Sequence, residues 1–248
     1  MKASGLGDAR SIATRECYYQ VHRRSPILDL WTSNDKLRYK ARVVYPTVAE
    51  MRGLIQAEAP DNLVRRYVFG ELPYVFKANP PTYETLKEHL RDELGVSVDN
   101  ITIVGSAKAG YSLAPDTFPR KFAKESDIDV VVVDARLFDD SWETLLTWNY
   151  PRRRRLPQAE WRWARNRQDD LYWGWFSPHR IRFEGLSFPE SLQPLRNLAT
   201  AWFAAFRSLS RYPELAGREV SGRLYRSWDH ALLYHVDGMR RLARRLAG

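Results

Sequence analysis

Residues 100–134, NITIVGSAKAGYSLAPDTFPRKFAKESDIDVVVVD, contain two short apolar runs that each meet polar residues at one end. The first run, Ile101–Val104, stops at Gly105-Ser106. The second run, Val130–Val133, is preceded by Asp127-Ile128-Asp129. Short β-branched runs bounded by turn residues are typical of buried strands. We therefore expect the two runs to be adjacent strands of one sheet.

The two aspartates at the head of the second run predict a metal site. Side chains alternate faces along a strand, so Asp127 and Asp129 project from the same side, about 6–7 Å apart along the chain. Two carboxylates this close repel each other unless a cation lies between them. Magnesium takes oxygen ligands, and commonly one or two carboxylates together with substrate phosphates. The pair therefore predicts a site for Mg²⁺ or Mn²⁺ and a phosphate-bearing ligand.

Gly105-Ser106 followed by Asp127-x-Asp129 resembles the signature of the DNA polymerase β-like nucleotidyltransferases. The pattern Gly-Ser-x-x-x-Gly-Tyr-Ser-Leu-Ala-Pro, followed further on by Ser-Asp-Ile-Asp, resembles bacterial members of this superfamily that are found near anti-phage defence and toxin–antitoxin genes. The resemblance covers about residues 83–148, and the spacer between its two halves is longer than usual. It implies an α+β fold in which a mixed sheet with helices forms the nucleotidyltransferase core, joined by C-terminal helices.

The resemblance also assigns roles to residues. It implies that the Gly-Ser turn opens a short helix whose backbone N–H groups hold nucleotide phosphates, and that the two aspartates bind the metal pair. Lys108 is near enough to reach a triphosphate, or else is only solvent-exposed. A third carboxylate is expected on a later strand, with Glu184, Asp169 and Asp170 as candidates by position. The predicted site consists of Asp127, Asp129 and Glu184 as catalytic residues, and Gly105, Ser106 and Lys108 as nucleotide-binding residues.

The function expected from this site is metal-dependent transfer of an NMP from an NTP or dNTP, such as ATP. The acceptor would be a hydroxyl of a nucleotide, a nucleic acid or a protein, in bacterial antiviral defence. Two alternatives stay open. One is a degenerate scaffold that binds nucleotide or nucleic acid without chemistry. The other is a toxin–antitoxin subunit that is active only with a protein partner encoded nearby.

Composition sets broader bounds on the protein. Of 248 residues, 44% are hydrophobic and 28% charged, which is typical of a globular chain rather than a disordered one. The single cysteine, Cys17, excludes an internal disulfide and a cysteine-rich zinc site. No secretory signal follows Met1, and no apolar run reaches the length of a membrane span. We therefore expect a cytoplasmic protein without membrane contacts.

The net charge of +9 indicates an anionic partner, most simply a nucleotide or nucleic acid. Arginine is concentrated after position 150, and a loop bounded by prolines is predicted to bind nucleic acid through Arg152, Arg153, Arg154 and Arg155. Tryptophans interleaved with arginines follow this loop. They suit base stacking on single strands, but we favour a buried position for them, with the arginines stacked on their outer faces. These tryptophans are Trp161, Trp163, Trp173 and Trp175.

The chain is expected to have three parts. Residues 1–69 form a partly irregular and partly helical segment, residues 70–190 the nucleotidyltransferase core, and residues 191–248 a C-terminal helical segment. A 3–4 residue spacing of apolar side chains predicts the longer helices, and Thr82 is expected to be the N-cap of one of them. The predicted helices span residues 47–58, 62–67, 83–94, 137–148, 195–209 and 225–246, and a further strand is expected at 181–183.

Overall fold

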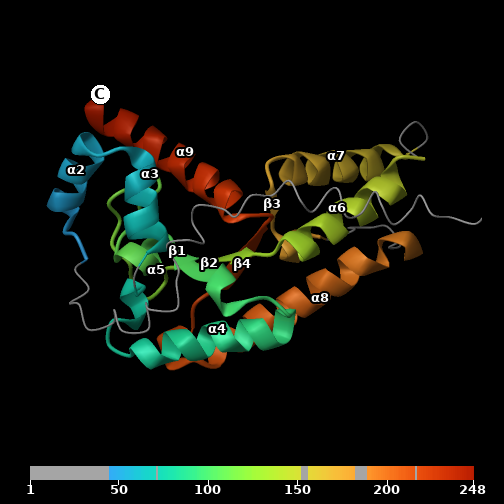
Figure 1. Cartoon of the computed structure of the whole chain (residues 1–248), viewed down its shortest axis with the longest axis horizontal. Coiled ribbons are helices and arrows are strands. Elements are labelled where there is room, and N and C mark those ends of the chain that lie inside the picture. The colour runs from blue at the N-terminus through green and yellow to red at the C-terminus, as the bar shows by residue number, and fades with distance from the viewer. Residues whose placement is uncertain (1–44, 71, 152–155, 182–188, 216) are drawn as a thin grey trace, which may run out of the picture. The chain divides into compact units, whose positions relative to one another are not determined.

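The computed structural model describes residues 45–70, 72–151, 156–181, 189–215 and 217–248, which form an α+β fold with a four-stranded mixed sheet (Figure 1). All of these residues belong to one compact unit. The predicted class, α+β with a mixed sheet, is confirmed. The three-part division stays a prediction, and a strand within residues 191–248 lies in the same sheet as the two predicted strands.

The sheet is built around the predicted valine strand. β1 (Ile101–Val104) pairs antiparallel with β2 (Ile128–Val133), and β4 (Val220–Tyr225) pairs with β2 in parallel on its other side. β3 (Trp175–Phe176) pairs antiparallel with β4, so the order is β1-β2-β4-β3. The two predicted strands are therefore neighbours, as the sequence led us to expect.

Helices connect and cover these strands. The longer ones are α2 (Val48–Ala57), α4 (Pro80–Leu94), α6 (Ala135–Asn149), α7 (Gln158–Tyr172), α8 (Gln193–Ser208) and α9 (Trp228–Ala247). The shorter ones are α3 (Pro60–Leu63), η3 (Val64–Phe69), η4 (Tyr74–Phe76), η5 (Val98–Asn100), α5 (Ser106–Ala109), η6 (Pro178–Arg180), η7 (Glu190–Leu192), η8 (Leu209–Arg211) and η9 (Pro213–Leu215).

Local capping explains where the predicted helices begin and end. The Thr47 side chain accepts a hydrogen bond from the Glu50 N–H, and the Glu50 carboxylate accepts one from the Thr47 N–H at 2.7 Å. This capping box satisfies two N–H groups that have no partner within the helix. α4 ends at Gly95, whose φ of 66° is the left-handed conformation that glycine adopts without strain.

The prediction of Thr82 as an N-cap is wrong. α4 begins two residues earlier, at Pro80, because proline suits a first turn in which the N–H needs no partner. Asn79 is the N-cap residue instead. Thr82 lies inside the helix, where its hydroxyl donates a hydrogen bond to the Glu214 carboxylate at 3.1 Å.

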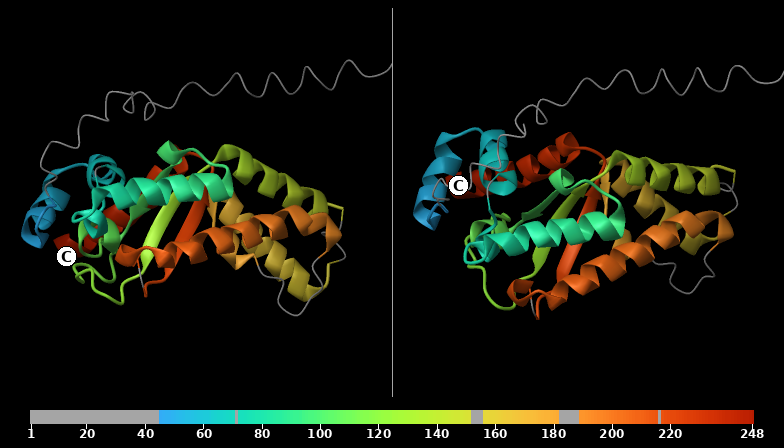
Figure 2. Two further views of the ribbon diagram at one scale, coloured as in Figure 1. Left: turned by 90° about the horizontal axis from the view of Figure 1, so that it is seen from below. Right: turned by 60° about the horizontal axis from the view of Figure 1, so that its bottom comes forward.

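Helices lie on both sides of the sheet (Figure 2), and each face of the sheet contributes to a separate apolar core. Successive side chains of β2 point to opposite faces. Ile128, Val130 and Val132 therefore enter the core that contains residues of α4, α6 and α8. Val131 and Val133 enter the core that contains residues of α2, η3 and α9. The buried, valine-rich character of β2 follows from this coverage on both faces.

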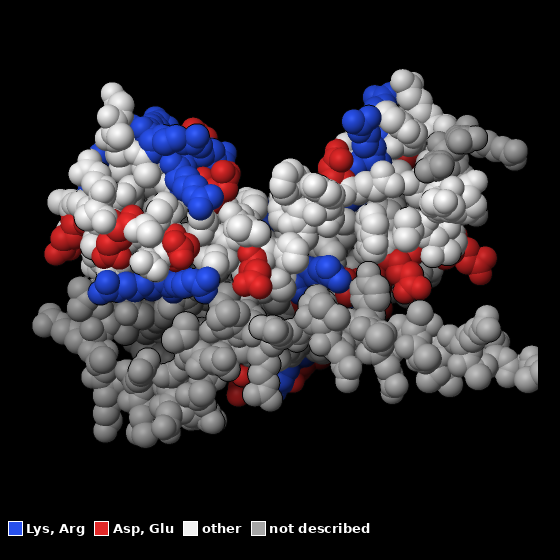
Figure 3. Space-filling view, turned by 45° about the horizontal axis from the view of Figure 1, so that its top comes forward, with Lys and Arg blue, Asp and Glu red and all other residues white. Residues whose placement is uncertain are grey.

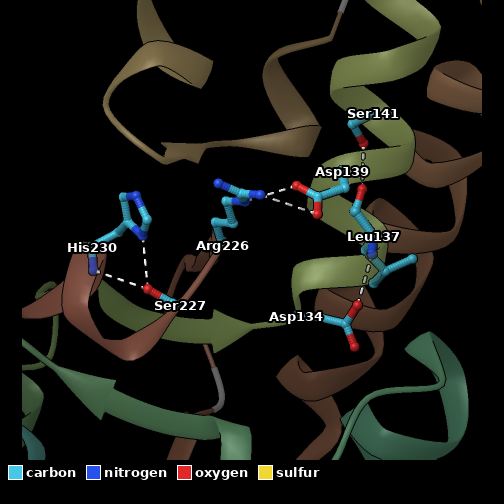
Figure 4. A network of polar contacts seen from close by, with 7 residues as sticks. All are labelled: Asp134, Leu137, Asp139, Ser141, Arg226, Ser227 and His230. Carbon is cyan, nitrogen blue, oxygen red and sulfur yellow. Dashed lines mark hydrogen bonds and ion pairs between the residues drawn. The ribbon is translucent and has the colours of Figure 1, made fainter. Parts of the chain in front are cut away.

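A polar network anchors the end of β4 (Figure 4). Arg226 donates hydrogen bonds to the two carboxylate oxygens of Asp139 on α6, at 2.8 and 3.4 Å. Ser227 caps α9 and contacts the His230 Nδ1 at 2.7 Å. The contacts join β4, α6 and α9 at one corner of the fold.

Among the elements not predicted as such are α7 and β4. In α7 only Ala164 and Leu171 are buried, so its apolar stripe is too sparse to be recognised from spacing. β4 has the sequence Val-Ser-Gly-Arg-Leu-Tyr. The glycine and arginine in its middle interrupt the β-branched and aromatic residues by which a strand is recognised. The strand predicted at 181–183 lies almost wholly outside the described residues. None of the described helices combines the length and the apolar character needed to cross a bilayer.

We expect Gly222→Ala to destabilise the fold. A Cβ atom at Gly222 of β4 would lie 2.2 Å from the Phe206 ring, which is buried in α8. Overpacking of this kind costs about 1–3 kcal/mol. Gly238→Ala is the matched control, because a Cβ atom at this position of α9 would meet no other atom within 4 Å, and alanine should gain about 0.5–1 kcal/mol in a helix interior. Urea unfolding measures both, and equal effects of the two changes would contradict this packing.

Candidate functional site

The candidate site centres on Asp129, the one exposed residue in β2. Its neighbours across the sheet are Val104 of β1 and Ser221 of β4. Because paired residues point to the same face, Asp129 shares a face with Val131, and therefore with α9 and its core. A carboxylate exposed in an otherwise buried interior strand is unusual, since such strands are normally apolar throughout.

The Gly105 turn lies directly against this carboxylate. Gly105 has φ 69° and ψ −149°, a conformation that is essentially restricted to glycine. A Cβ atom at this position would lie 3.1 Å from Asp129 Oδ2. The glycine therefore lets the backbone between β1 and α5 approach the carboxylate closely. Ser106 opens α5 at the same turn, so the structure brings together Gly105, Ser106 and Asp129 as predicted.

Backbone contacts hold Asp127 beside the start of β4. The Ile128 N–H donates to the Glu219 carbonyl at 2.8 Å. Arg218 donates to the carbonyl of Ala123 and to those of Lys124 and Ser126, at 2.8 and 3.2 Å for the last two. Its guanidinium also lies 4.4 Å from the centroid of the Phe122 ring. One arginine thus ties the segment that precedes Asp127 to the segment that precedes Glu219.

The electrostatics of Asp129 reflect three neighbouring charges. Partial burial is the largest effect and raises the pKa of the Asp129 carboxyl, even though the side chain reaches solvent. The positive charge of Arg223 lowers this pKa, whereas the negative charges of Asp127 and Glu219 raise it further. A carboxylate that is partly desolvated and close to like charges is stabilised by a cation. The donor set therefore suits a hard divalent ion in its chemistry.

Glu219 is a further carboxylate near Asp129 that the sequence pattern did not single out. It immediately precedes β4, which is the strand that pairs with β2, and its charge acts on Asp129. The available signal was its position at the head of Val220–Tyr225, but that run was not recognised as a strand. Within the described ranges, no group of three or more His, Cys, Asp and Glu side chains is arranged to hold a metal ion. The pair Asp127 and Asp129 remains the predicted ligand set, with Glu219 nearby.

Of the three residues predicted as candidates for a third carboxylate, Asp169 and Asp170 lie on α7 and Glu184 lies outside the described residues. Asp170, in the last turns of α7, forms an ion pair with Arg167 at 3.1 Å. Partial burial raises the pKa of Asp170, while Arg167 and then Arg180 lower it. Asp169 precedes it on the exposed side of the helix. Neither aspartate lies on a strand adjacent to β2.

Lys108 takes a position that the sequence did not indicate. It lies in α5 rather than in a loop, and it is 3% exposed. Its ammonium donates a hydrogen bond to the Gly70 carbonyl. The expectation of a solvent-exposed lysine is therefore wrong, and the prediction that Lys108 reaches a triphosphate loses its basis. The residue instead joins α5 to the end of η3.

The long spacer between Ser106 and Asp127 forms an ordered loop. The Ser112 N–H donates to the Arg120 carbonyl at 2.8 Å, and the Phe122 N–H donates to the Gly110 carbonyl at 2.9 Å. Arg245 near the end of α9 donates to the Pro115 carbonyl at 2.6 Å. These bonds close the loop at its base and attach its tip to α9, so the extra length does not prevent Asp129 from pairing with Val104 of β1.

The tryptophans of the arginine-rich region divide into two groups. Trp163 packs edge-on against buried Trp148, with ring centroids 5.6 Å apart, and Trp175 packs against Tyr234 at 5.3 Å. Trp161 and Trp173 are exposed, and Arg165 lies over the Trp161 ring. Trp163 and Trp175 are half-buried and pack against the two cores, which partly fits the favoured interpretation for these two of the four. The loop Arg152–Arg155, predicted to bind nucleic acid, lies outside the described residues.

Comparisons with known proteins give no match: no family model, no curated protein and no solved structure matches this chain. The resemblance carried by Gly105-Ser106 and Asp127-x-Asp129 therefore stays a prediction. Any functional proposal for this protein rests on the geometry and charges of the site itself.

His235 lies on α9, and the charge of Arg223 acts on it. We expect this histidine to make the free energy of unfolding depend on pH. The rings of Phe69, Tyr225 and Tyr234 surround it, and its Nε2 has no hydrogen-bond partner among the described residues. Burial, followed by the positive charge of Arg223, lowers its pKa to about 3. The unfolded chain therefore binds a proton between pH 6.5 and 3 that the folded chain does not, so stability falls as pH drops through this window.

The measurement is urea unfolding of the wild type and His235→Phe at pH 7 and pH 5. Between pH 7 and pH 5, the free energy of unfolding of the wild type should fall by about 2 kcal/mol more than that of the variant. The difference between the two proteins cancels the titration of carboxylates that they share. Equal losses in both would contradict a neutral, buried His235.

Proposed function

We propose that the protein is a metal-dependent nucleotidyltransferase that moves an NMP from an NTP or dNTP onto a hydroxyl group. The observation that carries the proposal is the contact between the Gly105 turn and Asp129. The Gly105 backbone has a conformation that is essentially restricted to glycine. A Cβ atom added to Gly105 would lie 3.1 Å from Oδ2 of Asp129 on the adjacent strand. A plain strand-ending turn has no need of this approach.

The chain's own groups have distinct roles in this proposal. Asp127 and Asp129 would hold Mg²⁺ or Mn²⁺, with Glu219 beside them. The ion supplies charge neutralisation for the triphosphate and a lower pKa for an attacking hydroxyl. Gly105 admits a phosphate close to the backbone, and Ser106 offers its hydroxyl and N–H as donors. The buried residues of β2 and the Arg218 contacts keep the two aspartates in fixed positions.

A second candidate function is nucleotide or nucleic-acid binding without turnover. It is favoured by the residue opposite Asp129 on β4, which is Ser221 rather than a carboxylate. Under this alternative, the metal site lacks a third carboxylate ligand among the described residues, and the aspartates serve only to bind. A bacterial protein partner and a role in antiviral defence stay predictions from the resemblance.

Turnover tests the proposal directly. The protein is incubated with labelled NTPs or dNTPs, Mg²⁺ or Mn²⁺, and bulk nucleic acid as acceptor, and pyrophosphate release is measured. We expect release by the wild type that falls to background in Asp127→Asn and in Asp129→Asn, because each change removes a negative ligand while keeping the side chain's size.

Asp140→Asn is the matched control, since this exposed aspartate belongs to α6, which packs on the other face of the sheet. It should retain full activity. Release that survives both site changes would place the chemistry elsewhere. Nucleotide binding with no release under any condition would favour the second candidate.

A further inference from the structure

Arg223 is held between aromatic side chains next to the candidate site. Its guanidinium carbon lies 5.1 Å from the centroid of the Trp175 ring and 4.8 Å from that of the Tyr234 ring. The guanidinium donates a hydrogen bond to the Tyr234 hydroxyl. These contacts fix a partly buried positive charge in one position.

Arg226, three residues further along the chain, provides a contrast. Its guanidinium is neutralised by two hydrogen bonds to the Asp139 carboxylate (Figure 4). Across the part of the chain that the structure describes, no Asp or Glu forms an ion pair with Arg223. A guanidinium has five N–H donors, and a partly buried charge without an ionic partner is costly. An anion at Arg223 would therefore be strongly stabilised.

The position of Arg223 relates it to Asp129. The register pairs Asp129 with Ser221, so Arg223, two residues later on β4, points to the same face of the sheet. Its charge acts on the carboxyl groups of Asp129 and Asp170. Tyr234 belongs to α9 and Asp170 to α7. Figure 3 shows that the surface is hollowed between these two helices and carries Lys and Arg side chains on both sides.

We propose that Arg223 binds a phosphate group of the nucleotide's polyphosphate, beside the cation held by Asp127 and Asp129. The ligand's identity as a nucleotide rests on the proposed function, whereas the anion-binding role rests on the contacts of Arg223. A planar guanidinium matches two phosphate oxygens at once. The carboxylates and the arginine then act on opposite charges, since the carboxylates hold the cation and Arg223 holds an anionic oxygen.

Binding without turnover tests this role. Inorganic tripolyphosphate and ATP are titrated separately into the full chain by calorimetry, in EDTA, so that neither metal binding nor catalysis contributes. Arg223→Gln should weaken the binding of both by about tenfold or more, which is the loss expected for a charge-assisted bond. Arg223→Lys keeps the charge but not the planar fork, so it should lie between the wild type and the glutamine variant.

Arg226→Gln is the matched control, because it removes the same charge from the neighbouring position and should leave both affinities within about twofold of the wild type. Urea unfolding of each variant establishes that the fold is retained. Equal weakening by Arg223→Gln and Arg226→Gln would overturn the proposal, as would wild-type protein that binds neither ligand. Loss of tripolyphosphate binding in Arg223→Gln alone would support it even if no pyrophosphate release is ever observed.

Discussion

Pairing on both edges of β2 is the constraint on which the site depends. β1 and β4 occupy the two edges, and helices cover both faces, so nearly every side chain of the strand is buried. Asp129 is the exception, and it remains partly desolvated among the charges of Asp127, Glu219 and Arg223. The fold accepts an unfavourable carboxylate environment at this point, and such environments are more common at functional sites than elsewhere.

Local sequence was sufficient to predict the two strands and the turn that form one half of the candidate site. β1 and β2 have uniform β-branched runs, and Gly105 is a strong turn signal because its conformation requires glycine. α2, α4, α6, α8 and α9 also follow from regular apolar spacing, although proline moved the start of α4. In each case the information lies within a few neighbouring residues, so no knowledge of distant contacts was needed.

The other half of the site comes from contacts between residues far apart in the sequence. β4 lies about ninety residues after β2, and its pattern is interrupted by Gly222, which makes room for Phe206, and by Arg223, which packs on aromatic rings. Glu219 and Arg223 become recognisable as neighbours of Asp129 only when the parallel register is known. Lys108 illustrates the converse, because its spacing from Ser106 suggested a ligand contact that burial against Gly70 does not support.

The central claim is that Asp127 and Asp129 together bind a divalent cation, and the electron paramagnetic resonance signal of free Mn²⁺ tests it most directly. Titration of Mn²⁺ into the wild type and into a double variant, Asp127→Asn with Asp129→Asn, counts bound ions without any need for substrate or turnover. The account predicts that the wild type binds an ion that the double variant does not, and that Asp140→Asn binds like the wild type. Equal Mn²⁺ binding by the wild type and the double variant would contradict it.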